Sequence, residues 1–166
     1  MAGEEAIAAG ADGLIATSPA EVDLLVSILR LCSVINRPMQ DGVADPEGLT
    51  LNELRALMSI GGEGELAGHE LTELIGMPPM NASRALLSLE QRGWIEVAPD
   101  PDNRRRKPYR ISAAGLAAYG AMMPEIAEVA AFLLKGLDAR EMERFGRTAH
   151  KIMRRIDQWK KRDEQQ

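Results

Sequence analysis

The chain has 166 residues, of which 45% are hydrophobic and 27% are charged, and its formal net charge is −5. This composition is that of an ordinary globular protein with one domain's worth of core, and no apolar run approaches the roughly 20 residues of a membrane-spanning helix. The single cysteine, Cys32, excludes an intrachain disulfide and favours a cytoplasmic location.

The charge is distributed unevenly along the chain. Residues 1–76 carry a net charge of −10, residues 77–112 a net charge of +3, and residues 113–166 a net charge of +2. A local positive patch matters more for contact with a polyanion than the total charge does. We therefore expect the middle segment to be the part of the chain that meets a phosphate backbone.

The N-terminal part predicts a tail followed by one long helix. Residues 1–17 are acidic and rich in alanine and glycine, and they lack the basic start of a signal peptide, so we expect a flexible tail. Ser18-Pro19-Ala20-Glu21 has the pattern of a capping box with proline at the first helical position. It predicts a helix over about residues 19–38 that ends near Pro38.

Two shorter helices are predicted next. Thr50-Leu51-Asn52-Glu53 is a second capping box, and it predicts a helix that runs to about Ser59 and stops at Gly61-Gly62. A third helix is expected over about residues 69–75, because Gly76 offers the left-handed conformation that follows a helix.

Residues 78–112 predict a helix followed by a β-hairpin. The helix has a polar face made by Asn81, Ser83, Arg84 and Ser88, and an apolar face made by Leu86, Leu87 and Leu89. Gly93 ends it, and residues 94–97 then alternate apolar with polar side chains, as a half-buried strand does. The turn at residues 99–103 leads to a second strand, and the cations beside it are Arg104, Arg105, Arg106, Lys107 and Arg110.

Two long helices complete the chain. Ser112 caps the first, in which Pro124 predicts a kink, and Asp138 caps the second. Apolar residues alternate at spacings of three and four in both, and in the N-terminal helix, which is typical of a packed heptad seam. One core within the chain is the simpler interpretation, and we favour a homodimer. Its predicted contact residues are Leu25, Ile28, Leu133, Phe145, Ile152, Ile156 and Trp159.

The order of these elements resembles the MarR family of bacterial transcriptional regulators over residues 19–160. The resemblance is carried by Leu49-Thr50, Glu70-Leu71-Thr72-Glu73, Asn81-Ala82-Ser83-Arg84, Leu89-Glu90-Gln91-Arg92-Gly93, the turn from Asp100 to Arg106, and Ile111-Ser112-Ala113-Ala114-Gly115. It implies a mainly α fold with a small β-hairpin wing. The winged helix-turn-helix would span residues 49–112, between dimerisation helices at residues 18–48 and 113–162.

Two positions depart from the family pattern. Arg105 falls at the family's wing arginine, but Asn103 stands where the family has the aspartate that orients it. Pro108 removes a backbone donor from the second wing strand, so we expect that strand at an edge. The neighbouring cations still predict contact with phosphate and the minor groove.

A winged helix-turn-helix reads a groove with its second helix and holds the adjacent backbone with its wing. On a major-groove helix, arginine pairs with guanine and asparagine with adenine. The predicted DNA contacts are Pro79, Met80, Asn81, Ser83, Arg84, Ser88, Arg104, Arg105, Arg106 and Lys107. The alternative is a solvated helix face beside ordinary surface charge.

The resemblance also implies a small-molecule effector, often an aromatic acid or its thioester. Arg30 and Arg37 are candidates to bind an anionic ligand, although solvation or pairing with nearby carboxylates is the simpler interpretation. Cys32 offers a redox-sensing alternative, weighed against a buried small apolar residue. The two histidines are far apart in sequence, so we predict no metal site and no cofactor.

The sequence contains no phosphate-cradling glycine loop, no Gly-x-Ser-x-Gly motif and no zinc motif, so we do not expect an enzyme. We expect a cytoplasmic regulator that binds double-stranded DNA as a homodimer and is released by a ligand. The alternative is a winged-helix module that docks an acidic protein partner through its basic hairpin.

Overall fold

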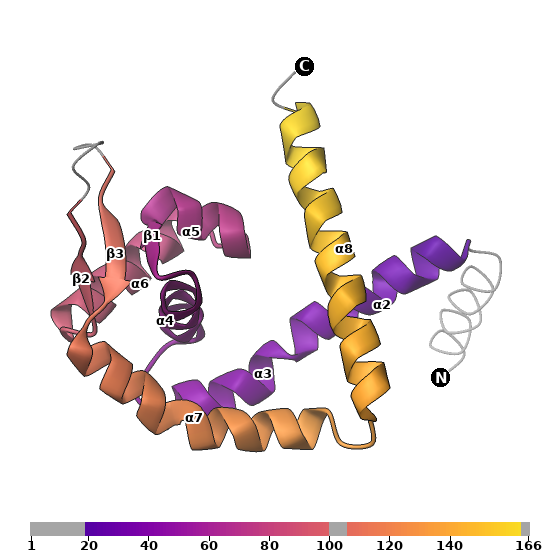
Figure 1. The fold of residues 1–166 in the computed structure, drawn as a ribbon, viewed down its shortest axis with the longest axis horizontal. Helices are drawn as coiled ribbons and strands as arrows, with labels where there is room; N and C mark the ends of the chain where they lie inside the picture. The colour runs from indigo at the N-terminus through magenta and orange to yellow at the C-terminus, as the bar shows by residue number, and fades with distance from the viewer. Residues whose placement is uncertain (1–18, 100–105, 164–166) are drawn as a thin grey trace, which may run out of the picture. The chain divides into compact units, whose positions relative to one another are not determined.

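The computed structural model describes residues 19–99 and 106–163, with side chains as far as residue 159. In chain order the elements are α2 (Ala20–Val34), α3 (Asn36–Met39), a π-helical turn η1 (Gln40–Ala44), α4 (Leu51–Glu63), β1 (Glu65–Ala67), α5 (Gly68–Ile75), α6 (Pro79–Gln91), β2 (Ile95–Val97), β3 (Pro108–Ile111), α7 (Ala113–Leu133) and α8 (Ala139–Asp163) (Figure 1). The predicted fold class, mainly α with a small β wing, is confirmed. The chain divides into two units after Val129, and α8 belongs to the second.

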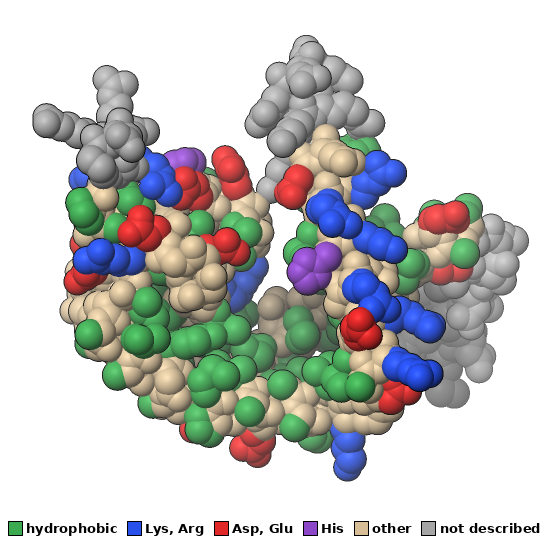
Figure 2. Space-filling view, in the orientation of Figure 1, with side chains coloured by type: hydrophobic (Ala, Val, Ile, Leu, Met, Phe, Trp, Pro, Cys, Tyr) green, Lys and Arg blue, Asp and Glu red, His purple; other side chains and the backbone are tan. Residues whose placement is uncertain are grey.

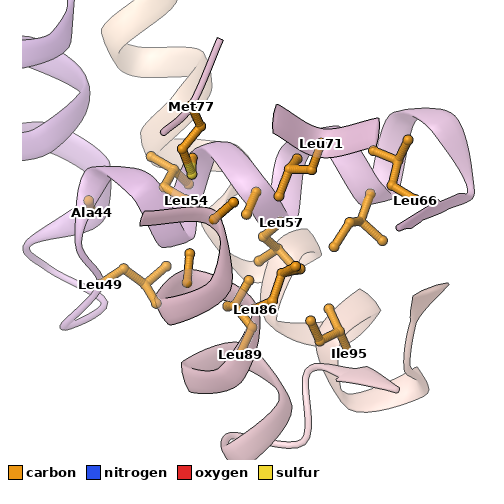
Figure 3. Packing of buried hydrophobic residues seen from close by; sticks show 14 of the residues in the cluster. Ala44, Leu49, Leu54, Leu57, Leu66, Leu71, Met77, Leu86, Leu89 and Ile95 are labelled. Atoms are coloured by element: carbon orange, nitrogen blue, oxygen red, sulfur yellow. The ribbon is translucent and has the colours of Figure 1, made fainter. Parts of the chain in front are cut away.

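The core of the first unit lies where α4, α5 and α6 meet the sheet. Figure 3 shows apolar side chains from these elements pointing toward one another. The buried set includes Leu54, Leu57, Leu71, Leu86, Leu89 and Ile95. Each buried leucine or isoleucine contributes about 1.5–3 kcal/mol relative to an exposed one, so this cluster fixes how α6 lies against α4 and α5.

The sheet has three antiparallel strands in the order β1-β3-β2. β1 was not predicted, because three residues between two helices carry too little periodicity. The expected edge position of Pro108 is wrong, since β3 lies in the centre. Pro108 is tolerated there because it is the first residue of the strand, opposite Ala67, and its carbonyl accepts a 2.8 Å hydrogen bond from the Ala98 amide.

The first helix ends earlier than predicted and its continuation runs further. α2 stops at Val34, whose carbonyl would accept a hydrogen bond from residue 38 in a regular helix. Pro38 has no N–H to donate, so the α-helical ladder is interrupted four residues before the proline. The chain then continues through α3 and η1 to Ala44.

The second helix runs beyond the predicted stop at Gly61-Gly62. α4 continues to Glu63, and Gly64 ends it with φ +88°. A glycine inside a helix costs only about 1 kcal/mol relative to alanine, which packing of α4 against α6 can offset. The other glycine stops are confirmed, because Gly76 has φ +64° and Gly93 has φ +71°.

The predicted caps at Thr50 and Asp138 are confirmed. The Thr50 hydroxyl accepts a hydrogen bond from the Glu53 amide at 3.2 Å, and the Glu53 carboxylate accepts one from the Thr50 amide at 2.6 Å. Asp138 and Glu141 exchange the same pair of bonds at the start of α8. Each such cap contributes about 1 kcal/mol to its helix.

The start of α7 is fixed against the hairpin. The Ser112 hydroxyl accepts from the Gly115 amide at 3.0 Å and donates to the Gly93 carbonyl at 2.5 Å, which confirms Ser112 as the cap. α7 then passes through Pro124 as one helix to Leu133. It therefore connects the winged helix to the second unit.

By length and composition alone, α7 is long and apolar enough to cross a membrane. Its middle carries Glu125 and Glu128. A charged side chain at the centre of a bilayer costs roughly 3 kcal/mol or more, which argues against a spanning role. Hydrophobic side chains gather over α7 in Figure 2.

Candidate nucleic-acid interface

Helix α6 presents one side to the core and the other to solvent. Pro79 stands at its first position, where the missing amide costs no hydrogen bond. The buried side is made by Ala82, Ala85, Leu86 and Leu89. The small alanines let α6 approach its neighbours closely, so the opposite side is held in a fixed orientation.

The solvent side of α6 carries both donors and apolar groups. Ser83 and Arg84 are exposed and Asn81 is half-buried, as a groove-reading helix requires. Leu87 was assigned to the apolar face, and this is wrong, since 54% of it is exposed. Met80 is also exposed, at 65%. Two apolar side chains among donors suit contact with thymine methyl groups.

Ser88, unlike Ser83 and Arg84, does not lie on the exposed side of α6. It is half-buried in a hollow of about 360 Å³ between α4 and α6, which Asn81 and Arg84 also line. Its side chain lies beside the carboxylate of Glu53, a residue that lines the same hollow and is only 7% exposed. Burial raises the pKa of Glu53, but hydrogen bonds from Ser88 and Thr50, together with the charge of Arg92, lower it overall. Ser88 thus supports α6 from within.

The wing cations have different surroundings. Arg104 and Arg105, with the departure at Asn103, lie outside the described residues. Arg106 pairs with Glu70 of α5 through two contacts of 2.8 Å, and Arg110 pairs across the sheet with Glu96 at 2.7 Å. Lys107 is exposed. Carboxylates of the chain itself therefore reduce the repulsion among the wing cations at Arg106 and at Arg110.

A hollow of about 620 Å³ lies between α5, α6 and β3. Ser83 and Leu87 line it from α6, and Lys107 and Tyr109 line it from the wing side. Burial and the charge of Glu90 raise the pKa of the Tyr109 phenol, so this group stays neutral at physiological pH. The hollow lies between α6 and the base of the wing.

The remaining candidates lie in the N-terminal helices. Arg30 is exposed on α2, and Arg37 pairs with Asp41 at 3.4 Å, both side chains largely in solvent. Cys32 is exposed, so its interpretation as a buried apolar residue is wrong. Among the residues that the structure describes, no group of three or more His, Cys, Asp or Glu side chains is placed to hold a metal ion.

Sequence reasoning missed the carboxylates that organise this interface. Glu53 was identified only as a helix cap and Glu70 only as part of the family resemblance. Both stand three residues after the cap residue of a helix, and Glu70 accepts a hydrogen bond from the Ala67 amide at 2.8 Å. That spacing signals a cap. It does not show that Glu53 also lies beside Ser88, or that Glu70 also pairs with Arg106.

Three helices closed by a three-stranded sheet, with a donor-bearing helix beside a basic hairpin, define a winged helix-turn-helix protein. Residues 47–106 match the MarR family model. The chain is 25% identical over 134 residues to the HTH-type transcriptional regulator YybA of Bacillus subtilis, covering 78% of this chain and 89% of that protein. The winged-helix segment of the chain is thus similar to that of MarR family transcriptional regulators.

Solved structures share the fold. A MarR family regulator from Silicibacter pomeroyi is 22% identical with a TM-score of 0.67, covering 78% of this chain and 86% of that one. Bordetella bronchiseptica BpsR, whose DNA binding is regulated by 6-hydroxynicotinic acid, is 17% identical with a TM-score of 0.62, covering 76% and 89%. At these identities the likeness shows the fold alone.

Proposed function

We propose that the protein is a cytoplasmic repressor that binds a pseudo-palindromic operator as a homodimer and is released by a small ligand. The observation that carries this proposal is the solvent side of α6, where Arg84 and Ser83 are exposed beside Asn81 on a helix whose other side is buried. A rigid helix with an exposed guanidinium beside a half-buried amide fits base edges in the major groove.

Exposed apolar side chains support the homodimer. No residue of α2 is buried, and Phe145 and Trp159 of α8 are 60% and 59% exposed. Apolar side chains exposed along a helix in this way mark an interaction site. The proposed contact residues remain Leu25, Ile28, Leu133, Phe145, Ile152, Ile156 and Trp159. A two-fold dimer would place two α6 helices on half-sites about one helical turn apart.

A ligand would release the protein from DNA by changing the spacing of the two α6 helices. A ligand that binds better to a dimer with altered spacing shifts the population away from the DNA-bound arrangement. An aromatic acid is the proposed effector class, and the regulation of BpsR by 6-hydroxynicotinic acid is consistent with it. Arg30 and Arg37, both exposed, are the proposed partners of its carboxylate.

Selection from a pool of random duplex DNA, followed by a salt titration, tests this function. The proposal expects enrichment of a two-fold symmetric site and a linear fall of log affinity with log salt concentration. Weak, salt-labile binding without an enriched site would contradict it. The enriched duplex then serves as the probe for aromatic acids, which should weaken binding.

A protein-docking module is the second candidate. Met80 and Leu87 are exposed on the same side of α6 as the donors, and apolar anchors are what a protein interface requires. Failure to enrich any DNA site, together with an acidic protein partner bound through this side of α6, would favour it. Redox sensing through the exposed Cys32 predicts that peroxide releases DNA and that Cys32→Ser abolishes the response.

A further inference from the structure

A two-pronged ion pair ties the base of the wing to helix α5. The Arg106 Nε lies 2.8 Å from one carboxylate oxygen of Glu70, and the Nη2 lies 2.8 Å from the other. The two side chains are 28% and 30% exposed, so the pair is partly shielded from water. Bidentate arginine–carboxylate pairs are the geometrically most specific ion pairs.

Glu70 is also held in place by a contact that does not involve Arg106. Its carboxylate accepts a hydrogen bond from the Ala67 amide at 2.8 Å, and it stands in the first turn of α5. The bond with Arg106 lowers the pKa of Glu70, with the Ala67 amide contributing further. The carboxylate is therefore ionised at neutral pH and fixed at the junction of β1 and α5.

The same residues lie at the end of the sheet. Ala67 of β1 stands opposite Pro108, the first residue of β3, and the Ala98 amide bonds to the Pro108 carbonyl. Arg106 precedes Pro108 by two residues, beyond these last hydrogen bonds. Glu70 thus links the end of β1, through the Ala67 amide, to Arg106 just before the start of β3. The ion pair extends the attachment of the wing past the point where the sheet stops.

We propose that Glu70 is a positioning residue for DNA binding: it holds the base of the wing beside α5 and α6 through Arg106, and Arg106 acts as this brace and not as a phosphate contact. The proposal rests on the proposed function, because it assigns how the DNA-binding surface is held. A braced wing would bind DNA without first ordering its base, which lowers the cost of association.

The direction in which Glu70→Gln changes the affinity for duplex DNA distinguishes the two possible roles of Arg106. If Arg106 contacted phosphate, Glu70→Gln would remove a competing negative charge and free the guanidinium, so affinity for duplex DNA would rise. If Glu70 is a brace, the same variant weakens binding to the enriched duplex by about threefold to tenfold, because the wing is less preorganised. An unchanged or tighter complex overturns the proposal.

The salt dependence of DNA binding also distinguishes a brace from a phosphate contact. A residue that neutralises one phosphate changes the slope of log affinity against log salt by about 0.9. Arg106→Gln should weaken binding with an unchanged slope, while Lys107→Gln, the adjacent exposed cation, should reduce the slope. The exchange Glu70→Arg with Arg106→Glu should recover affinity relative to either single variant. A slope reduced by Arg106→Gln to the same extent as by Lys107→Gln overturns the brace.

Amide hydrogen exchange tests the brace without DNA. Glu70→Gln should speed exchange at Lys107 and in β3 relative to the wild type, with α6 unchanged and the thermal midpoint close to that of the wild type. Equal exchange in both proteins would overturn the proposal even if no DNA site were found. If the wild type binds no selected duplex, the proposed function fails by itself, and faster exchange still establishes the brace.

Discussion

Gly115 at the start of α7 lies against the backbone of Trp94, and a Cβ built on Gly115 would stand 1.9 Å from the Trp94 carbonyl oxygen. The same carbonyl accepts a 2.9 Å hydrogen bond from the Ser112 amide. The neighbouring Ile111 side chain would lie 3.0 Å from that Cβ. Only glycine permits this approach, so the junction between the hairpin and α7 has one compatible geometry.

Gly115→Ala should lower the free energy of unfolding by about 2–3 kcal/mol, because a backbone carbonyl cannot move aside as a side chain can. Urea denaturation measures it. Gly120 provides the matched control, since it lies in the same helix with nothing within 4 Å of its Cβ position. Gly120→Ala should stabilise by about 0.5–1 kcal/mol. Equal effects of the two variants would show that the close approach is absent in solution.

The free energy of unfolding should depend on pH through Glu53, at the start of α4. The pKa of Glu53 is lowered in the folded protein, so its contribution is present above the unfolded pKa and is lost as the pH falls through the folded value. The free energy of unfolding should therefore be insensitive to this group above about pH 5 and decline below it. Glu53→Gln should flatten the decline, as measured by denaturation at a series of pH values.

Removing the cap itself tests the same region at neutral pH. Thr50→Ala should cost about 1 kcal/mol, since the Glu53 amide loses its hydroxyl acceptor. Thr50→Ser keeps that acceptor and should cost less. A thermal melt in which both variants match the wild type would mean that the hydrogen bond contributes nothing.

The homodimer should depend on the apolar side of α8. Phe145→Glu places a charge within the proposed contact and should raise the dimer dissociation constant by at least about tenfold, because an unpaired charge would be buried. Sedimentation velocity measures the shift to monomer. Gln158→Glu makes the same charge change on another side of the helix and should leave the dimer intact. Dimers of equal stability in both variants would contradict the assignment.

Local signals predicted most of the fold. Caps at Thr50, Ser112 and Asp138 and the glycine at 76 each depend on a few neighbouring residues, and each lies where it was predicted. The passage of α4 through Gly61-Gly62 depends on packing against another helix, and the central place of Pro108 depends on a strand more than forty residues away in sequence. Such contacts leave no local pattern.

In the candidate interface, too, local sequence patterns predicted some features, while others depend on contacts between residues far apart in the sequence. The donors on α6 follow from helical spacing, so Ser83 and Arg84 were placed correctly on its exposed side. The pairing of Arg106 with Glu70 joins residues 36 positions apart, and composition could identify only that a cation was present. The exposure of Leu87 was missed because three nearby leucines were treated as one face.

The most direct test of the central claim, that α6 reads base edges, is the affinity of Arg84 variants for the enriched duplex and for a duplex of scrambled sequence. Arg84→Ala should lose about 1–3 kcal/mol of discrimination between them. Arg84→Lys keeps the charge but not the two-pronged donor, so it should lose discrimination while retaining salt dependence. If Arg84→Ala bound the enriched duplex with unchanged affinity and unchanged preference, α6 would not be the reading helix.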